Sequence, residues 1–321
     1  TYAASANIIC HTGAKPIFVD SLPGEFNLDP AVVEAALSSQ TKAVIPVDIG
    51  GYPANNQQLS EVISSASFQA ANPAQELLGR PLLFSDAAHS FGATFHGKPA
   101  CHYADISGYS FHAVKNLTTA EGGALAFNLP DQFDTDEVYA WFMRMSLHGQ
   151  SKDALAKTQG GSWKYDIVDH GYKCNMTDLQ AAIGLVELER YADDMLPRRK
   201  AICSAYHAGF ANEEWYEAMP TASHKKSSNH LFMLRIKRST EAQRDQIIDA
   251  IKGKGVAVNV HFPPLHRFTA FSSLGYSDVH FPNAVDAFSR EISLPVYYDL
   301  TDASVQTVIN AVKQSVKEIL G

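Results

Sequence analysis

The first half of the chain alternates short apolar runs with helical segments. Residues 57–65, between the first two runs, have the spacing of an amphipathic helix. Each run is short enough to be a strand that is buried on both faces. The pattern therefore predicts an α/β fold in which a mostly parallel central sheet is flanked by helices. The apolar runs are residues 43–49, 81–88, 104–111 and 123–128.

Capping residues mark the starts of two predicted helices. Asp29 and Pro30 suit the N-cap and the first position of a helix over 29–37. Thr177 suits the N-cap of a helix over 177–191. Further predictions are a helix over 131–147, a strand over 16–19 after a turn at Gly13, and a polar loop or insertion over 67–80.

The last third of the chain has the pattern of a second domain. A helical segment over 195–210 contains Pro197, which predicts a kinked connection. A strand, a helix, a second strand and a long final helix follow, at residues 230–237, 241–252, 256–260 and 302–320. We therefore expect a large domain over 1–195 and a smaller α+β domain over 196–321.

Composition and charge narrow the class of protein. The chain has 321 residues, of which 45% are hydrophobic and 19% are charged. Its net charge of -8 argues against broad nucleic-acid binding, which needs a basic surface. No apolar run approaches the about 18 residues of a membrane helix. Four widely spaced cysteines and the lack of a signal peptide predict reduced thiols and a cytoplasmic location. The first residues resemble the inside of a domain, so we expect a preceding segment to be missing from this sequence.

Asp86 directly follows an apolar run, so it is expected near the carboxyl end of a buried strand. Open α/β sheets bind their ligands at those ends. One interpretation of Asp86 is the N-cap of a following helix. The other is a carboxylate that faces a ring nitrogen of a cofactor.

Lys115 lies in the loop between two predicted strands. A lone lysine is usually a solvated charge, but this one has chemical neighbours. Ser110, at the end of the preceding strand, suits a phosphate, and residues 121–123 suit a tight turn. A strand-end lysine, an aspartate such as Asp86 and a phosphate-binding serine form a minimal site for pyridoxal phosphate (PLP). The lysine makes a Schiff base, and the aspartate keeps the pyridine nitrogen protonated.

The same residues carry a family resemblance. The segments SDAAHSFGATFHGK and ADISGYSFHAVKNLTTAEGGALAF resemble the signature of the PLP-dependent sugar aminotransferases of the DegT family. The similarity continues through GYKCNMTDLQAAIGLVELER, VNVHFPPLHRF and ISLPVYYDLTDASVQTVINAV, and so covers nearly the whole chain. It implies a large domain like that of aspartate aminotransferase, a smaller α+β domain, and PLP as cofactor.

The resemblance also implies roles for single residues. Lys115 matches the Schiff-base lysine, whose amine then carries the proton between cofactor and substrate. Asp86 matches the partner of the pyridine nitrogen, and Ser110 matches a phosphate ligand. His89 matches a position against the cofactor ring or its hydroxyl, although a surface histidine on a helix is its ordinary interpretation. Tyr2 matches an aromatic that stacks on the ring.

Two further implications of the resemblance concern the neighbouring subunit and the segment upstream of this sequence. Asn175 matches an asparagine that reaches the neighbouring subunit's active site, which implies a homodimer with shared sites. The family also has a phosphate-binding loop of the type Gly-Thr-Ala-Leu upstream of the position at which this sequence begins.

Four more residues match the substrate side of the family's site. His261 and His266 lie in HFPPLH, which resembles a segment lining a sugar-nucleotide pocket. A metal site is the alternative for this pair, but no third ligand with suitable spacing is near. His148 resembles part of a loop at the sugar, although a helix C-terminus also explains it. Lys173 belongs to the segment Lys-Cys-Asn, a variant of the family's sequence that favours one subclass of sugar acceptor.

The resemblance therefore implies an enzyme that transfers an amino group from an amino acid, glutamate, to a nucleotide-linked keto-sugar. Lys173 and the HFPPLH segment favour members that aminate C4 of UDP-linked sugars. The alternatives are a sugar 3-aminotransferase, an inositol-ketone aminotransferase, or a PLP-binding regulatory protein without turnover. Lys115 argues against the related sugar dehydratases, which have histidine at this position. If the chain were a purely structural module, Asp86, Ser110 and Lys115 would occur together only by chance.

Overall fold

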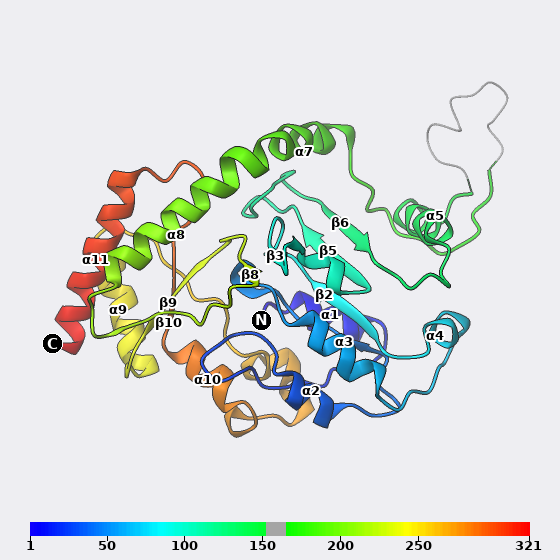
Figure 1. Cartoon of the computed structure of the whole chain (residues 1–321), viewed down its shortest axis with the longest axis horizontal. Helices are drawn as coiled ribbons and strands as arrows, with labels where there is room; N and C mark the ends of the chain where they lie inside the picture. Colours follow the sequence, from blue (N-terminus) through cyan, green and yellow to red (C-terminus); the bar gives the residue numbers. More distant parts are fainter. Residues whose placement is uncertain (152–164) are drawn as a thin grey trace.

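A four-stranded sheet forms the centre of the first half of the chain. The computed structural model describes residues 1–151 and 165–321 (Figure 1). The strands β1, β2 and β5 are parallel, and β6 is antiparallel to β5. The sheet is thus mixed and mostly parallel, as predicted. Its order is β1 (Ala43–Val44), β2 (Leu82–Asp86), β5 (Ile106–Ser110) and β6 (Gly123–Phe127).

Helices flank this sheet, and α2 and α3 bury its apolar side chains. Asp29 accepts from the amide of Ala31 at the start of α2, and Thr177 forms a capping box with Gln180 at the start of α7. The helices are α1 (Ala4–His11), α2 (Pro30–Ala36), α3 (Asn56–Ser64), α4 (Pro73–Leu78), α5 (Thr135–Ser146) and α7 (Asp178–Arg190). The core cluster consists of Val33, Val44, Leu59, Ile63, Leu83 and Ala104.

A long helical connection leads to the second half. Helix α7 continues through a π-helical turn, Tyr191–Met195, into α8 (Leu196–Phe210), and the run slopes from α7 at the top down to the left in Figure 1. Pro197 follows this turn by two residues and has no amide to donate back into the continuous helix. The predicted kink is therefore a widened turn just before the proline.

The second half is an α+β unit with its own core. Its antiparallel sheet has the order β10 (Glu291–Leu294), β9 (Phe232–Ile236) and β7 (Tyr216–Glu217). The helices packed with it are α8, α9 (Glu241–Gly253), α10 (Pro282–Ser289) and α11 (Asp302–Leu320). The largest buried apolar side chains of this core include Tyr206, Phe210, Leu234, Ile236, Ile247 and Ile251.

Small elements join the two halves. Strand β3 (Thr94–Phe95) pairs with β4 (Lys98–Pro99) and with β8 (Lys225–Lys226), which comes from the second half. The short 3₁₀ helices are Ile49–Gly51, Ala100–Tyr103, Leu265–Arg267, Thr269–Leu274 and Asp278–His280. Across residues 1–151 and 165–321, no helix combines the length and the apolar composition needed to cross a membrane.

Three predicted elements differ from the structure. Residues 16–19 pair with no neighbouring strand, so they form no strand of their own. The supposed loop over 67–80 contains α4, because Asn72 caps it, Pro73 starts it and Gly79 ends it in the left-handed conformation.

Residues 256–260 are the third difference. Val256, Val258 and Val260 pack on the second core, as their apolar character predicts. Only Asn259 exchanges backbone hydrogen bonds with the sheet, at Ser293, so the segment forms a bridge instead of a strand. This bridge fixes the position of the next residue, His261.

Candidate active site

Two neighbouring parallel strands carry Asp86 and Ser110 to the same edge of the sheet. Asp86 ends β2 and Ser110 ends β5, and Asp86 lies opposite Gly108 in the register. Both residues line one cavity of about 200 Å³, which α1 also lines. The remaining residues around this cavity are Ala4, Ser5, Ile8, Ile45, Phe84, Ala88, Gly108 and Tyr109.

The carboxylate of Asp86 is held by two donors. The hydroxyl of Ser5 donates to it at 2.5 Å, and the amide of Ala88 donates at 3.2 Å. Residues 87–92 form turns, so the alternative that Asp86 caps a helix is wrong. Its carboxylate is therefore oriented toward the cavity edge by a helix and by its own turn.

Lys115 lies in a closed loop after β5. The amide of Phe111 donates to the carbonyl of Gly122 at 2.8 Å, and this hydrogen bond closes the loop. Gly122 has φ +158°, and a Cβ at this residue would lie 2.3 Å from the Thr119 hydroxyl, so the closure requires glycine. Burial lowers the pKa of Lys115, and the negative charge of Asp86 opposes this effect only in part. The amine is thus easier to deprotonate than that of a surface lysine.

Asn116, which sequence reasoning missed, anchors this loop to the second half of the chain. Its amide nitrogen donates to the Tyr191 hydroxyl at 3.2 Å and to the carbonyl of Ser228 at 2.9 Å. Its amide oxygen lies 2.8 Å from Nδ1 of His230. Its place beside Lys115 was the only signal in the sequence, since these partners are 75 to 114 residues away.

A row of rings packs together beside Lys115. His89 lies 4.2 Å from His230 and 6.2 Å from Phe262, and Phe262 lies 5.6 Å from Tyr2, measured between ring centroids. The backbone amide of Gly50 donates to Nδ1 of His89 at 3.2 Å. His89 is buried, so its interpretation as a surface histidine is wrong.

Three imidazoles around Lys115 are uncharged at neutral pH. Burial and the positive charge of Lys115 hold the pKa of His89 and of His230 well below the usual range. The same two causes lower the pKa of His261 to about 4. Neutral rings keep one bare nitrogen, so this wall of the site can both donate and accept hydrogen bonds. His230 had no recognisable signal in the sequence.

Three of the other predicted residues lie in a separate part of the structure. Lys173 donates to Asn175, and Leu147 pairs with Lys173 in a backbone bridge. The amide of His148 donates to the carbonyl of Tyr172 at 2.7 Å. The side chains of His148 and Lys173 are exposed, and Asn175 is half-buried just before α7. These residues form one neighbouring group at the end of α5.

His266 has partners of its own. Its Nε2 lies 2.7 Å from a carboxylate oxygen of Asp278, and its ring packs on Phe281. The side chain of His266 is thus engaged by Asp278 and Phe281, whereas that of His261 is engaged by Ser293. Within the described parts of the chain, no three metal-ligating side chains form a cluster.

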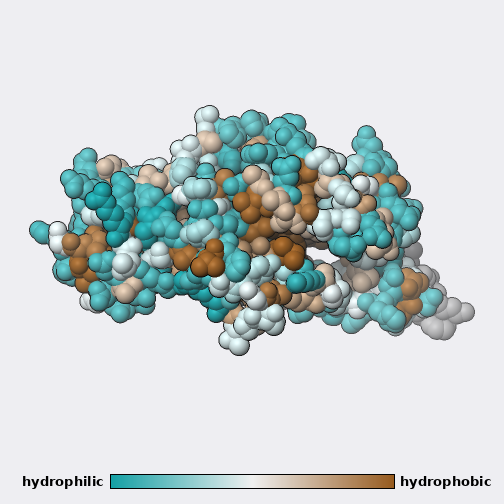
Figure 2. Space-filling view, turned by 90° about the horizontal axis from the view of Figure 1, so that it is seen from below, coloured by the Kyte–Doolittle hydropathy of each residue, from teal (hydrophilic) through white to brown (hydrophobic). Residues whose placement is uncertain are grey.

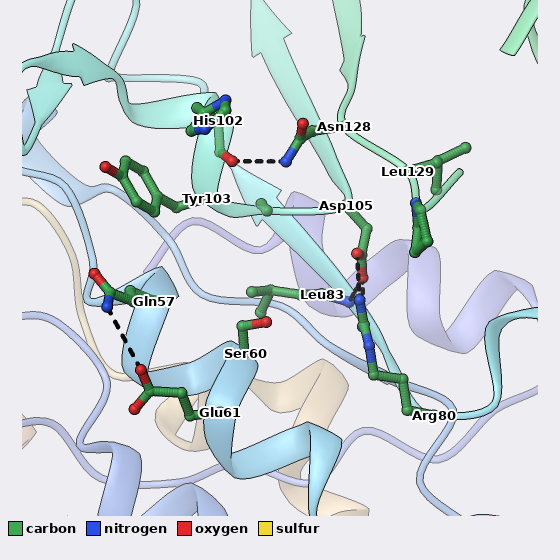
Figure 3. A pocket seen from close by; sticks show the side chains of 12 residues that line it. Gln57, Ser60, Glu61, Arg80, Leu83, His102, Tyr103, Asp105, Asn128 and Leu129 are labelled. Carbon is green, nitrogen blue, oxygen red and sulfur yellow. Dashed lines mark hydrogen bonds and ion pairs between the residues drawn. The ribbon is translucent and has the colours of Figure 1, made fainter. Parts of the chain in front are cut away.

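A larger cavity, of about 400 Å³, lies at the opposite edge of the sheet (Figure 3). Asp105 precedes β5 there, whereas Ser110 ends that strand. Two nitrogens of Arg80 bond to Asp105 at 2.8 and 2.6 Å, and the amide of Leu83 also donates to it. Arg80 and Asp105 neutralise each other's charge, so this cavity offers fewer reactive groups than the one at Asp86.

The groups at the smaller cavity and in the loop after β5 suit PLP. Asp86 supplies an oriented carboxylate, and Ser110 supplies a hydroxyl across the same cavity. Lys115 supplies an amine that burial favours in its neutral form. A carboxylate for the pyridine nitrogen, a donor for phosphate and a nucleophilic amine are the groups that this cofactor requires.

Comparison with known sequences gives one family. The model of the DegT/DnrJ/EryC1/StrS aminotransferase family matches residues 1–313. MJ1066 of Methanocaldococcus jannaschii, described as uncharacterized, is 36% identical over 321 residues, which cover 99% of this chain and 78% of that protein. The spore coat polysaccharide biosynthesis protein SpsC of Bacillus subtilis is 34% identical, with coverage of 99% and 77%.

Solved structures agree with the family model. The putative sugar aminotransferase Spr1654 of Streptococcus pneumoniae, in its PMP form, matches with a TM-score of 0.94 at 39% identity, over 99% of this chain and 80% of that one. Its PLP form matches with a TM-score of 0.92 at 38% identity, over 100% and 80%. PseC of Helicobacter pylori has a TM-score of 0.84 at 23% identity, over 99% and 78%, and so supports the fold alone. The chain belongs to the DegT/DnrJ/EryC1/StrS aminotransferase family and is a PLP-dependent sugar aminotransferase.

Proposed function

We propose that this enzyme moves an amino group from glutamate to a nucleotide-linked keto-sugar, and that the acceptor is a UDP-linked 4-keto sugar. The observation that carries the proposal is the placement of Asp86 and Ser110 in one cavity, together with Lys115 in the loop that directly follows the strand of Ser110. The names of two relatives, a polysaccharide biosynthesis protein and a putative sugar aminotransferase, support a sugar as acceptor.

Each residue of the proposed cofactor site has a task. PLP supplies a ring that accepts the electron pair released at the substrate carbon. Lys115 is the covalent attachment point, and its amine then moves the proton at that carbon. Asp86 holds the proton of the pyridine nitrogen, and Ser110 donates to the phosphate. His89 and Tyr2 pack against the ring.

The substrate side is proposed to combine both halves of the chain. His261 comes from the second half, and burial and the charge of Lys115 affect its ring. His148 and Lys173 come from the group at the end of α5. His266 has a structural role instead, because Asp278 and Phe281 already occupy its ring. Separate hydrophobic cores support a large domain over 1–195 and a small domain over 196–321.

A homodimer with shared sites is the proposed assembly. Helix α7 lies on the outside of the molecule (Figure 1) and leaves several large apolar side chains exposed. Other apolar residues gather near the middle of the face shown in Figure 2. A second copy that covers α7 removes this surface from water. Asn175, which lies just before α7, is proposed to reach the partner's cofactor. The exposed residues of α7 are Leu179, Ile183, Leu185, Val186 and Leu188.

We also propose that the enzyme works in the cytoplasm. Its four cysteines form no disulfide, and Cys10 and Cys174 are exposed. Exposed free thiols suit a reducing compartment.

The experiment supplies the PLP-loaded enzyme with glutamate and one keto compound at a time. Mass spectrometry then follows the amino product from a UDP-4-keto sugar, a UDP-3-keto sugar and an inositol ketone. We expect amination of the UDP-4-keto sugar, with no product from Lys115→Ala. Preferred amination of another ketone contradicts the proposed acceptor but leaves the enzyme class intact.

A further inference from the structure

A chain of hydrogen bonds connects His261 to a buried carboxyl group. Glu291, the first residue of β10, is fully buried, and Ser293 is 4% exposed. The hydroxyl of Ser293 donates to Oε1 of Glu291 and also lies 2.7 Å from Nδ1 of His261. The other carboxyl oxygen, Oε2, accepts from the backbone amide of His261 at 3.0 Å. The three side chains therefore form a line with His261 at its outer end.

The fold explains why these residues meet. Glu291 and Ser293 are two positions apart on a strand, so their side chains lie on the same face. The backbone bridge between Ser293 and Asn259 brings the segment before His261 alongside β10. Neither Glu291 nor Ser293 was a candidate from the sequence, because a glutamate in an apolar run gives no sign of its partner.

The hydrogen bonds restrict where protons can lie along these three side chains. Oε2 is occupied by the amide of His261, so a proton on the carboxyl group has to point from Oε1 to Ser293. Ser293 has one hydroxyl proton, which it gives either to Glu291 or to His261. With the carboxyl ionised, Ser293 donates to Glu291 and accepts from Nδ1–H of His261. With the carboxyl protonated, Ser293 donates to Nδ1, and His261 carries its proton on Nε2.

We infer that Glu291, Ser293 and His261 form a proton relay whose buried end is Glu291 and whose outer end is Nε2 of His261. When the proton on Nε2 leaves, the hydroxyl proton of Ser293 moves to Nδ1 and the carboxyl proton of Glu291 moves to Ser293. One proton leaves at Nε2 and one negative charge appears on Glu291. Delivery of this proton to a group in the active site rests on the proposed function, but the relay itself does not.

The electrostatic environment of Glu291 and His261 suits a proton relay that operates near neutral pH. Burial raises the pKa of Glu291 to about 8, and the hydrogen bonds from Ser293 and His261 and the charge of Arg244 on α9 oppose this only in part. Arg235 on the facing strand β9 is paired with Glu217. His261 stays uncharged over this range, because burial and the charge of Lys115 lower its pKa to about 4.

The test reads the tautomer of His261 directly by ¹⁵N NMR of histidine-labelled, PLP-loaded protein, with His261→Gln to assign the signals. In the wild type we expect Nε2–H at pH 6 and Nδ1–H at pH 9. In Glu291→Gln the amide has to donate to Ser293 while its oxygen accepts from the amide of His261. That variant is therefore expected to hold Nε2–H at both pH values. A tautomer change equal to that of the wild type overturns the inference.

Two further variants make the test specific. Ser293→Ala interrupts the line and is expected to abolish the dependence of the tautomer on Glu291; a preserved change contradicts the relay even if Glu291→Gln does not fold. Glu318→Gln makes the same substitution at an exposed carboxylate on α11 that pairs with Lys254 outside the line, and we expect the wild-type change there. Because the readout needs no sugar, a failed amination assay does not affect it.

Discussion

The hydroxyl of Ser5 lies 2.5 Å from the carboxylate of Asp86, although the two residues are 81 positions apart in the chain. Ser5 belongs to α1, and Asp86 ends β2. The contact holds the carboxylate against one wall of the cavity that Ser110 also lines. Helix α1 therefore takes part in orienting the group that we propose for the pyridine nitrogen.

Ser5→Ala is expected to weaken PLP binding about tenfold. A hydrogen bond to a charged group contributes about 1.5–3 kcal/mol, and about 1.4 kcal/mol corresponds to a factor of ten. Titration of the apoprotein with PLP, followed by absorbance, measures the change. Ser5→Thr keeps the hydroxyl and is expected to bind nearly as the wild type does. Equal affinity in Ser5→Ala contradicts this role.

Asp86→Asn is expected to keep PLP bound and to slow amino transfer from glutamate by a factor on the order of 100 or more. The amide is neutral and cannot hold the proton of the pyridine nitrogen, so the ring becomes a poor acceptor of electrons. Single-turnover absorbance measurements with glutamate give the rate. A wild-type rate in this variant removes Asp86 from the mechanism.

The buried histidines make stability depend on pH. Unfolded, each binds a proton near pH 6.5, but in the fold His89 and His230 bind it only well below that pH and His261 only at about 4. At these three sites the unfolded state binds more protons below pH 6.5, so their contribution to the free energy of unfolding decreases as the pH falls. Glu291 and Asp48 contribute with the opposite sign, because burial raises their pKa to about 8 and about 6. Urea unfolding between pH 8 and pH 5 measures this slope.

His230→Gln is expected to reduce that slope by up to about 1.4 kcal/mol per pH unit, the value for one proton. His11→Gln is the control, because it makes the same substitution at an exposed histidine on α1. If both variants keep the slope of the wild type, His230 is not held uncharged by the fold.

The exposed face of α7 tests the proposed dimer. Leu179 and Ile183 are one helical turn apart and are 81% and 48% exposed. Leu179→Glu with Ile183→Glu is expected to convert a dimer into monomers, as measured by sedimentation velocity. Val279→Glu is the control, because Val279 is 82% exposed in a different part of the surface. A wild-type monomer, or a dimer that the double variant leaves intact, contradicts the interface.

Shared sites follow from the same arrangement. Lys115→Ala and Asn175→Ala are each expected to be inactive or strongly impaired. If they exchange subunits, a mixed dimer keeps one site with both native residues, so mixing restores part of the activity. Mixed dimers without any recovery show that Asn175 does not serve the partner's site.

Local signals were sufficient for much of the fold. The helix predicted over 302–320 matches α11, because Thr301 caps it and an apolar stripe faces the core. Asp86 and Ser110 were predicted at one edge, since parallel strands end on the same side of a sheet. In contrast, the strand predicted over 256–260 depended on pairing along its whole length, which the sequence does not report.

The residues that contact and position the candidate site residues were not predictable from the sequence. Asn116 meets His230 across 114 positions, and Glu291 meets His261 across 30. The first contact arises only when the two halves of the chain pack together, and the second only when the small domain folds. Each residue alone has an ordinary structural interpretation. His266 shows the converse, because its position in HFPPLH resembles a pocket segment while its ring is bound to Asp278.

The identity of the reactive lysine is the central claim. The direct measurement is to reduce the PLP-loaded enzyme with borohydride, digest it and locate the pyridoxyl group by peptide mass spectrometry. We predict a single modified peptide, with the group on Lys115, and no modification in Lys115→Ala. A pyridoxyl group on another lysine, or none on a protein that retains PLP, contradicts the account.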